Sequence, residues 1–349
     1  MNNTRIHTVV TLGDVAKQAG VSLATASRVL NGSTRRVNED LREIVMEAAN
    51  DLGYSPNLHA QAIARGTSST VGLVVHDIAD PYFSAIASGV MRVADDRGLI
   101  LTLGTTLRNP NRELQYVSML RAQRARAVIL VGSRVSDKEQ TERLAAEIQA
   151  FRQAGGHIAV VSQGRLPADT VTPENRAGAR ELAIRLAELG HRRFAVLAGP
   201  KHLLTSRDRL QGFKDGLRSK AIELEPSKVI VGAFTRDGGY QAARELLASK
   251  SNVSCVFAVN DVMAVGAMAA CREAGVRVPE DLSIAGFDDI ETLRDLTPSL
   301  TTVQLPLEEM GARAAELALE LDPPVDEERV VKVRGEVVLR DSTKKVRAR

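Results

Sequence analysis

The sequence has few of the residues that metal sites, disulfides and redox centres require. Its 349 residues include two cysteines, six histidines and no tryptophan, and aromatic residues make up 3%. Cys255 and Cys271 lie in apolar surroundings at no metal-ligand spacing, which indicates buried free thiols in a reducing cytoplasm. The histidines form no cluster, so the sequence predicts neither a metal site nor a cofactor.

Long apolar runs are missing as well. No stretch approaches the roughly 20 apolar residues of a membrane helix. Asp14 and Lys17 interrupt the segment where a signal peptide would lie. These absences predict a cytoplasmic protein without a membrane partner, and they oppose a receptor for solute transport.

Motifs typical of enzymes are also lacking. The sequence contains no phosphate-binding loop, no dinucleotide-binding fingerprint and no nucleophile elbow. His76 lies near Asp77 and Asp80, but no nucleophile pairs with it in sequence. We therefore expect that the protein is not an enzyme. A mobility shift on DNA, set against turnover of candidate sugars or nucleosides, distinguishes the two possibilities.

Residues 11–31 predict two short helices joined by a tight turn, the unit that places a helix in the major groove of DNA. Thr11 can cap the first helix with Asp14 as its partner. Gly20 occupies the turn, where a positive φ is expected, and Ser22 can cap the second helix. An ordinary helical hairpin is the alternative. The residues expected to point outward or along the groove are Leu23, Ala24, Thr25, Ser27 and Arg28.

A third helix is expected between Asn38 and Gly53. Residues 1–38 carry five basic side chains against one acidic one, whereas residues 39–56 carry five acidic side chains against one basic one. The two segments therefore have charges of about +4 and about −4. Phosphate contacts require the basic side to face DNA and the acidic helix to face away, so this polarity supports DNA binding.

From residue 70 onward, short apolar runs alternate with amphipathic helical segments. Such alternation predicts parallel sheets with helices on both faces, and two sets of four runs predict two lobes with a cleft between them. The runs are residues 71–75, 100–104, 127–132 and 157–163, then 194–199, 229–234, 255–260 and 283–288. Aromatic, carboxylate, amide and arginine side chains follow these runs. They suit a small polyhydroxylated or ring-shaped ligand outside the carboxyl ends of the strands.

Motifs along nearly the whole chain, from Thr11 to about Thr343, resemble the lactose-repressor/galactose-repressor (LacI/GalR) family. They are the helix pair and residues 52–57, 80–83, 189–194, 198–200, 259–266, 284–288 and 300–303. The resemblance implies a helix-turn-helix head followed by two doubly wound parallel-sheet lobes, similar to periplasmic binding proteins. It also implies a transcriptional repressor that binds a pseudo-palindromic operator in double-stranded DNA as a homodimer. Its effector would be a sugar, polyol or nucleoside-like molecule.

The resemblance also assigns candidate DNA contacts in the head. Arg28 corresponds to the recognition-helix arginine, and Leu23 and Ala24 correspond to the positions that vary with operator choice. Both are apolar here, so they offer contacts to thymine methyl groups and no hydrogen bonds. The other candidates are Thr11, Ser22, Thr25, Ser27, Asn31 and Arg36. The loop 31–37 is one residue longer than the family pattern, so the role of its arginines stays open.

Residues 57–65 correspond to the family's hinge helix. A helix this short is marginal alone in water, so we expect it to form when two copies meet in the minor groove. Asn57, Ala60 and Ile63 are its candidate DNA contacts. Ile63 stands where the family inserts a leucine between base steps; a linker residue without a role is the alternative.

Six residues correspond to the family's effector contacts: Phe83, Thr205, Arg209, Phe234, Asn260 and Asp288. The two aromatic rings could sandwich a ligand ring. Arg209 and Asp288 could each bind hydroxyl groups, and Asn260 can both donate and accept hydrogen bonds. Asp288 is expected to be a partly buried carboxylate, so either a hydroxyl donor or Arg209 should satisfy it. The sequence departs from the family at Glu174, where aspartate is usual, and at Leu203. Purine-binding members carry an arginine at the latter position, which argues against a purine corepressor.

These patterns divide the chain into four segments. A head covers residues 1–56, a hinge and linker 57–69, and a two-lobed effector-binding and dimerisation domain 70–341. A basic tail over residues 342–349 is expected to be disordered. The tail contains no heptad repeat of apolar residues, from which a four-helix tetramer interface could be built, so a dimer is expected. The sequence leaves open the identity of the effector, whether it induces or co-represses, and the operator sequence.

Overall fold

The computed structural model describes residues 10–30, 37–55, 68–249, 251–320 and 328–346. They belong to two units, Met1–Ser69 and Thr70–Arg349. The described part of the first unit holds the helices α1 (Leu12–Gln18), α2 (Leu23–Leu30) and α3 (Glu39–Asp51). Small residues let these short helices pack closely, and the buried core consists of Val15, Ala16, Ala26, Val45, Ala48 and Ala49.

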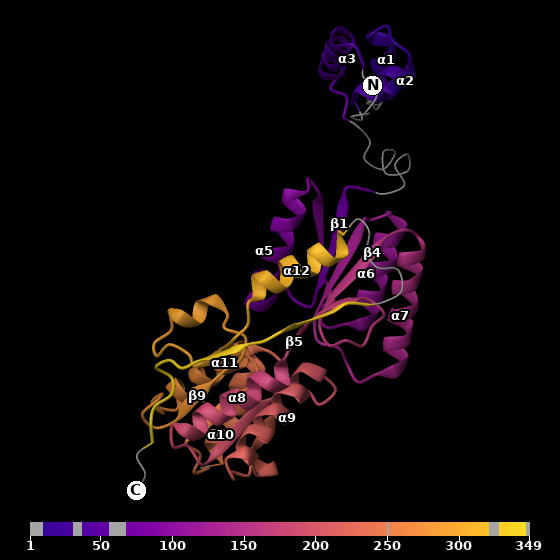
Figure 1. Ribbon diagram of the computed structural model, residues 1–349. Helices are drawn as coiled ribbons and strands as arrows, with labels where there is room; N and C mark the ends of the chain where they lie inside the picture. Colours follow the sequence, from indigo (N-terminus) through magenta and orange to yellow (C-terminus); the bar gives the residue numbers. More distant parts are fainter. Residues whose placement is uncertain (1–9, 31–36, 56–67, 250, 321–327, 347–349) are drawn as a thin grey trace, which may run out of the picture. The chain divides into compact units, whose positions relative to one another are not determined.

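The second unit contains two lobes, and the first of them is built on an all-parallel sheet. Its order is β11-β5-β4-β3-β1-β2. The central strands are rich in valine, isoleucine and leucine because helices cover both faces. Helices α5 (Pro81–Asp96) and α12 (Leu307–Ala318) pack on one face, and α6 (Pro110–Ala122) and α7 (Lys138–Gln153) pack on the other (Figure 1). The strands are β1 (Thr70–Val75), β2 (Ile100–Thr105), β3 (Ala127–Val131), β4 (His157–Val161), β5 (Asp169–Pro173) and β11 (Val330–Val333).

The second lobe has a smaller parallel sheet of order β7-β6-β8-β9. Helix α8 (Asn175–Glu188) packs against α9 (Leu204–Ser219), and α10 (Arg236–Ala248) packs against α11 (Asp261–Glu273). The strands are β6 (Phe194–Ala198), β7 (Val229–Val231), β8 (Cys255–Ala258) and β9 (Ser283–Ala285). A separate antiparallel pair consists of β10 (Thr302–Gln304) and β12 (Glu336–Val338). The chain passes between the lobes near residues 173–175, 304–307 and 333–336 (Figure 1).

Strand order fixes where a ligand cleft can form. Strand β1 connects to β2 on one side, whereas its neighbour β3 connects to β4 on the other. In the second lobe β6 connects to β7 on one side and β8 connects to β9 on the other. Loops diverge at such a reversal and leave a crevice outside the carboxyl ends of the strands. The loops after β1, β3, β6 and β8 therefore define the cleft.

Each of the eight predicted apolar runs overlaps one of the observed strands β1–β4 and β6–β9; β1 begins one residue before its run, and β2 ends one residue after its run. The first lobe, however, has six strands rather than four. Strand β5 reads Asp-Thr-Val-Thr-Pro, and its polar residues carry no apolar run by which the sequence could reveal it. Strand β11 returns from the far end of the chain to pair with β5.

The expectation that the chain is disordered from residue 342 is wrong for residues 342–346. Ser342 is fully buried. Its hydroxyl group donates to the Ile284 carbonyl at 2.7 Å and accepts from the Thr301 amide at 2.8 Å. The Val346 amide donates to the Leu189 carbonyl at 2.8 Å. The tail is held because its backbone and hydroxyl groups complete hydrogen bonds at the edge of the second lobe; residues 347–349 lie outside the described residues.

Candidate functional site

The helix pair α1–α2 has the predicted caps and the predicted turn. Thr11 and Asp14 form a reciprocal capping box, in which the Thr11 amide donates to Asp14 at 2.9 Å. These hydrogen bonds hold the pKa of the Asp14 carboxyl below its usual value. Gly20 has a φ of 67°, which a residue with a side chain adopts only with strain. The Ser22 hydroxyl accepts from the Thr25 amide at 3.1 Å and so caps α2.

Helix α2 presents the predicted face. Ala26 is fully buried against α1 and α3, whereas the Leu23 side chain is 56% exposed. Ala24 and Arg28 are exposed, and Thr25 and Ser27 are half-buried. The acidic side chains of α3 are likewise exposed: Glu39, Asp40, Glu43, Glu47 and Asp51. The candidate contacts Asn31, Arg36, Asn57, Ala60 and Ile63, together with the predicted hinge helix, lie outside the described residues.

The six predicted effector contacts line one cavity between the lobes of the second unit. Phe83 comes from the start of α5 in the first lobe, and Asp80 caps that helix. The second lobe supplies the other five from α9 and from the ends of its strands: Thr205, Arg209, Phe234, Asn260 and Asp288. The cavity has a volume of about 40 Å³, which is room for roughly three water molecules.

Arg209 is the central side chain of this cavity, and it is only 2% exposed. Its Nε donates to Asn175 Oδ1 at 2.8 Å, and Nη1 donates to the Val259 carbonyl at 2.8 Å. Nη2 donates to Asp288 Oδ1 at 2.6 Å. The guanidinium also lies over the Phe287 ring, 3.9 Å from its centre. Arg209 and Asp288 therefore bind each other, and one role of Arg209 is to hold the Asp288 carboxylate in place.

Two of the buried carboxyl groups at the strand ends of the second lobe have raised pKa values. Burial raises the pKa of Asp288 to about 6, although Arg209 opposes the shift. Burial also raises the pKa of Asp261 to about 7, and the neighbouring Asp288 adds to the shift. Asp261 accepts hydrogen bonds from Thr302 Oγ1 at 2.7 Å and from the Ile290 amide at 3.0 Å. It therefore joins the start of α11 to β10, next to a crossing between the lobes.

The raised pKa of Asp261 predicts how stability depends on pH. A carboxyl whose folded pKa lies above its unfolded value contributes stability at low pH that is lost as the pH rises through the folded pKa. Asp261→Asn removes this loss and can keep both hydrogen bonds. We expect the melting temperature of the variant, minus that of the parent, to increase from about pH 5 to about pH 8. Thermal melts across that range test this.

Asp281→Asn is the matched control for the pH experiment. Asp281 is hydrogen bonded to Arg277, which lowers the pKa of its carboxyl to about 2. This group stays ionised throughout the tested range, so the control should show a constant difference from the parent. The same constant difference for Asp261→Asn would contradict the prediction.

The aromatic residues differ from the expected sandwich. Phe83 is 4% exposed, and its ring makes edge-to-face contacts with Tyr82 at 5.1 Å and with His76 at 5.7 Å between centroids. Phe234 is half-buried, and the Arg108 guanidinium lies 5.6 Å from its ring centre. Phe83 therefore packs as part of the wall, and Phe234 carries the more accessible aromatic face.

Hydrogen bonds join the two lobes directly at the cleft. The Thr205 amide donates to Ser133 Oγ at 3.1 Å, and Gln163 Nε2 donates to Thr205 Oγ1 at 2.8 Å. The Ser136 amide donates to the His202 carbonyl, and the Leu204 amide donates to the Arg134 carbonyl, both at 2.9 Å. Apart from Thr205, these residues were not among the predicted contacts. Ser133 follows a predicted strand, but only the position of one lobe on the other reveals the bonds.

His76 is a further cleft residue that was not predicted as an effector contact. Burial and the nearby Arg134 lower its pKa to about 4, so the imidazole is neutral near pH 7. Its Nε2 lies 3.4 Å from the Ser133 carbonyl, and its Nδ1 lies 3.0 Å from Thr106 Oγ1. A neutral ring that donates from Nε2 and accepts at Nδ1 satisfies both contacts. His76 thus fixes the loops after β1, β2 and β3 relative to each other.

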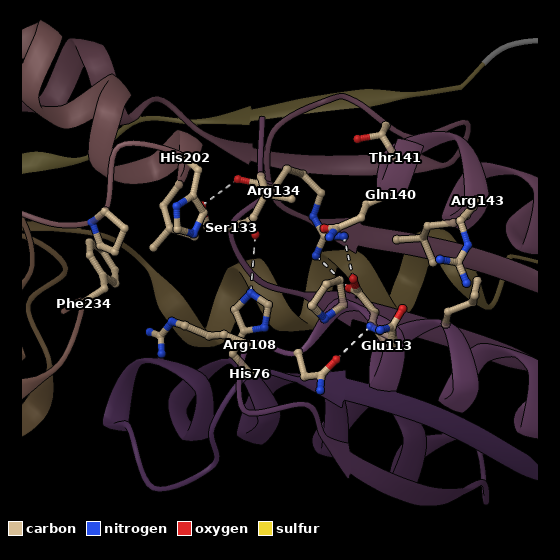
Figure 2. Close-up of a pocket in the computed structure, with 18 of the residues that line it drawn as sticks. His76, Arg108, Glu113, Ser133, Arg134, Gln140, Thr141, Arg143, His202 and Phe234 are labelled. Carbon is tan, nitrogen blue, oxygen red and sulfur yellow. Dashed lines mark hydrogen bonds and ion pairs between the residues drawn. The ribbon is translucent and has the colours of Figure 1, made fainter. Parts of the chain in front are cut away.

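A larger cavity of about 240 Å³ adjoins the first. The two share the lining residues His76, Arg108, Ser133 and Phe234. We call them the inner cleft, about 40 Å³, and the outer cavity. Figure 2 shows the outer cavity, with Arg108 and Phe234 toward one end and Arg143 toward the other.

The head and the two-lobed unit together define an effector-controlled transcriptional regulator. Residues 11–57 match the family model described as bacterial regulatory proteins, lacI family. Residues 183–343 match a periplasmic binding protein-like domain. The chain belongs to the lacI family of bacterial regulatory proteins. No helix in the described ranges is both long and apolar enough to cross a membrane.

Relatives and solved structures agree with this assignment over most of the chain. The transcriptional regulator GalR of Escherichia coli (strain K12) is 35% identical and aligns with 90% of this chain and 89% of its own length. The regulator DegA of Bacillus subtilis (strain 168) is 34% identical over 86% of this chain and 88% of its own length. The Lac repressor dimer bound to operator and the anti-inducer ONPF has a TM-score of 0.83 at 28% identity, covering 97% of this chain and 100% of its own. A complex of the regulator CelR with cellobiose has a TM-score of 0.67 at 31% identity, covering 95% and 99%.

Proposed function

We propose that the protein is a cytoplasmic repressor, not an enzyme, that binds a pseudo-palindromic operator as a homodimer. Its affinity for the operator is controlled by a sugar, polyol or nucleoside-like effector bound between the lobes. The observation that carries the proposal is the inner cleft, where the six predicted contacts converge at the strand-order reversals of both sheets. The head on the same chain supplies the DNA-binding activity that a ligand in this cleft would control. The sugar-bound relative supports the effector class.

The inner cleft offers groups that suit hydroxylated ligands. Asn260 Oδ1 accepts from the Met263 amide at 3.0 Å, which leaves the side-chain amide nitrogen for a ligand. Asp288 uses Oδ1 for Arg209, which leaves Oδ2 as an acceptor. Leu203 is 4% exposed and brings no charge to the cleft region, so a purine site based on an arginine at this position is disfavoured. The small volume of the cleft requires the lobes to separate for a ring to enter.

Operator binding should depend steeply on salt. The head carries its basic residues on the segment that includes the recognition helix, and neutralising phosphates releases counterions. We expect specific binding to weaken by orders of magnitude between about 50 and 200 mM salt. Mobility shifts on the operator at several salt concentrations measure the slope. An affinity that does not change with salt would contradict phosphate contact by the head.

The hinge, residues 57–65, is proposed to transmit the effector signal. An effector can regulate DNA affinity only by favouring one arrangement of the dimer, and this segment joins the head to β1. Ile63→Gly removes the proposed wedge and costs the helix about 1 kcal/mol. It should weaken specific operator binding far more than non-specific binding, as measured on operator and scrambled DNA.

Amide exchange provides the second measurement on the hinge. Protection of residues 57–65 only in the operator complex supports folding of the hinge on DNA. Equal protection in the free protein would refute it, as would an equal loss of specific and non-specific binding in Ile63→Gly.

A further inference from the structure

The outer cavity and the inner cleft have very different capacities. The inner cleft, with its polar groups, has a volume of about 40 Å³, whereas the outer cavity has about 240 Å³. They meet at His76, Arg108, Ser133 and Phe234, which line both. A ligand bound at Asp288 therefore lies next to the larger space, and a single small ring leaves most of that space unused.

Most of the surface that lines the outer cavity is apolar, although twelve of its 21 lining residues are polar or charged. The apolar lining residues come from α6, α7 and the loops after β3, β4, β6 and β7: Pro110, Leu114, Val135, Leu144, Leu166, Pro200, Leu203, Ala233 and Phe234. The one acidic lining residue, Glu113, is bound by Arg134 in a two-pronged ion pair at 2.8 and 3.0 Å. Both partners are buried. The cavity thus offers a mainly apolar surface, with neutral polar and basic side chains among its lining residues and no free acidic group.

Arg108 occupies the junction of the two spaces. The loop that holds it is fixed to β1, since the Thr106 amide donates to the Val75 carbonyl and the Leu107 amide donates to the His76 carbonyl. In the described part of the chain no carboxylate lies within ion-pair distance of its guanidinium. Its ring contact is with Phe234. A guanidinium whose position is fixed at the junction can donate hydrogen bonds to an oxygen atom that links the two halves of a ligand.

We propose that the effector is a two-part molecule, a glycoside, with a hydroxylated ring at the Arg209–Asp288 end and a second, weakly polar ring in the outer cavity. This inference rests on the proposed function, because it assigns the class of the same effector. The second ring is either another sugar, whose ring face is apolar, or an aromatic group. Burial of that ring against the apolar walls supplies affinity that a monosaccharide cannot gain.

The test compares each sugar with its extended forms. D-glucose, D-galactose, D-mannose, D-xylose and L-arabinose are titrated by calorimetry beside their p-nitrophenyl glycosides and disaccharides that end in the same sugar. For the sugar that binds, we expect an extended form to bind at least about ten-fold tighter. The p-nitrophenyl and disaccharide arms show which kind of second ring the cavity accepts.

Variants of the outer cavity make the test specific. Gln140 of α7 lines the outer cavity and not the inner cleft, and its side chain is half-buried. Gln140→Trp fills the cavity and should remove the ten-fold gain while the monosaccharide binds as before. Gln140→Ala is the matched control and should keep the gain. Ala233→Trp fills the cavity from the loop after β7. It provides the same test if Gln140→Trp does not fold.

The outcomes separate this inference from the proposed function. If a monosaccharide binds and its extended forms bind no tighter, or if neither tryptophan variant reduces their affinity, the two-part effector is wrong and the effector-controlled regulator stands. If no sugar or glycoside in the panel binds, the two-part glycoside effector is wrong, whereas the effector-controlled regulator stands, because its polyol and nucleoside-like effectors lie outside the panel.

Discussion

Replacing Arg209 by alanine is expected to abolish the effector response and to lower the free energy of unfolding of the two-lobed unit by about 3–5 kcal/mol. The reason is that Arg209 is buried and is the ion-pair partner of Asp288, which would be left as an uncompensated charge. Asn175 and the Val259 carbonyl would also lose their donors. Chemical denaturation measures the stability, and operator release at increasing effector concentration measures the response.

Asp288→Asn separates the two effects. It keeps an acceptor for Arg209 and the shape of the site, but it removes the carboxylate that we propose for a ligand hydroxyl. This variant should lose the effector response with a much smaller loss of stability, and its operator binding without effector should stay close to that of the parent. A normal effector titration in both variants would show that the ligand binds elsewhere.

The second large effect is expected at the recognition helix. Arg28→Ala should cost about 1–3 kcal/mol at one G·C pair and relax discrimination there, if the side chain is bidentate to guanine. Arg28 is exposed on α2, beside the exposed Leu23 and Ala24. Binding to operators with each base at that position, measured by mobility shift, gives the effect.

Arg42→Ala is the control for charge alone. Arg42 is exposed on α3, among the acidic residues that we expect to face away from DNA. Its removal changes the net charge as Arg28→Ala does, but it should leave the operator preference unchanged. If both variants weaken binding equally, or if Arg28→Ala keeps the full preference, the assignment of the recognition helix fails.

The sequence predicted elements whose signal is local. The capping box at Thr11, the positive φ at Gly20 and the apolar runs that match β1 to β4 and β6 to β9 all depend on neighbouring residues. The short polar strand β5 escaped prediction because its stability comes from pairing with β4 and with β11, a segment more than 150 residues away. Long-range pairing leaves no periodic pattern in the strand itself.

The sequence predicted which residues line the cleft, but it left open which of these residues bind one another. The resemblance to the family placed Arg209 and Asp288 at one site, and the structure brings them within 2.6 Å of each other. The sequence left open whether Arg209 or a hydroxyl donor satisfies Asp288, and the structure shows that Arg209 binds it. That Phe83 packs against His76 could not be seen in the sequence. The same limit applies to the bonds of Thr205 with Ser133 and Gln163, because they depend on how one lobe lies on the other.

Those bonds between the lobes have a thermodynamic consequence. In the structure they hold the cleft closed around a space too small for a sugar ring, so a ligand ring binds only a form in which the lobes have separated. The apparent dissociation constant is then the intrinsic constant divided by the fraction of molecules in the accepting form. The loop of residues 132–136, which makes three of these bonds, can therefore set the concentration at which the protein responds, in addition to any contact that it makes with the ligand. Two chains with the same ligand contacts in the second lobe can then differ in sensitivity through these bonds.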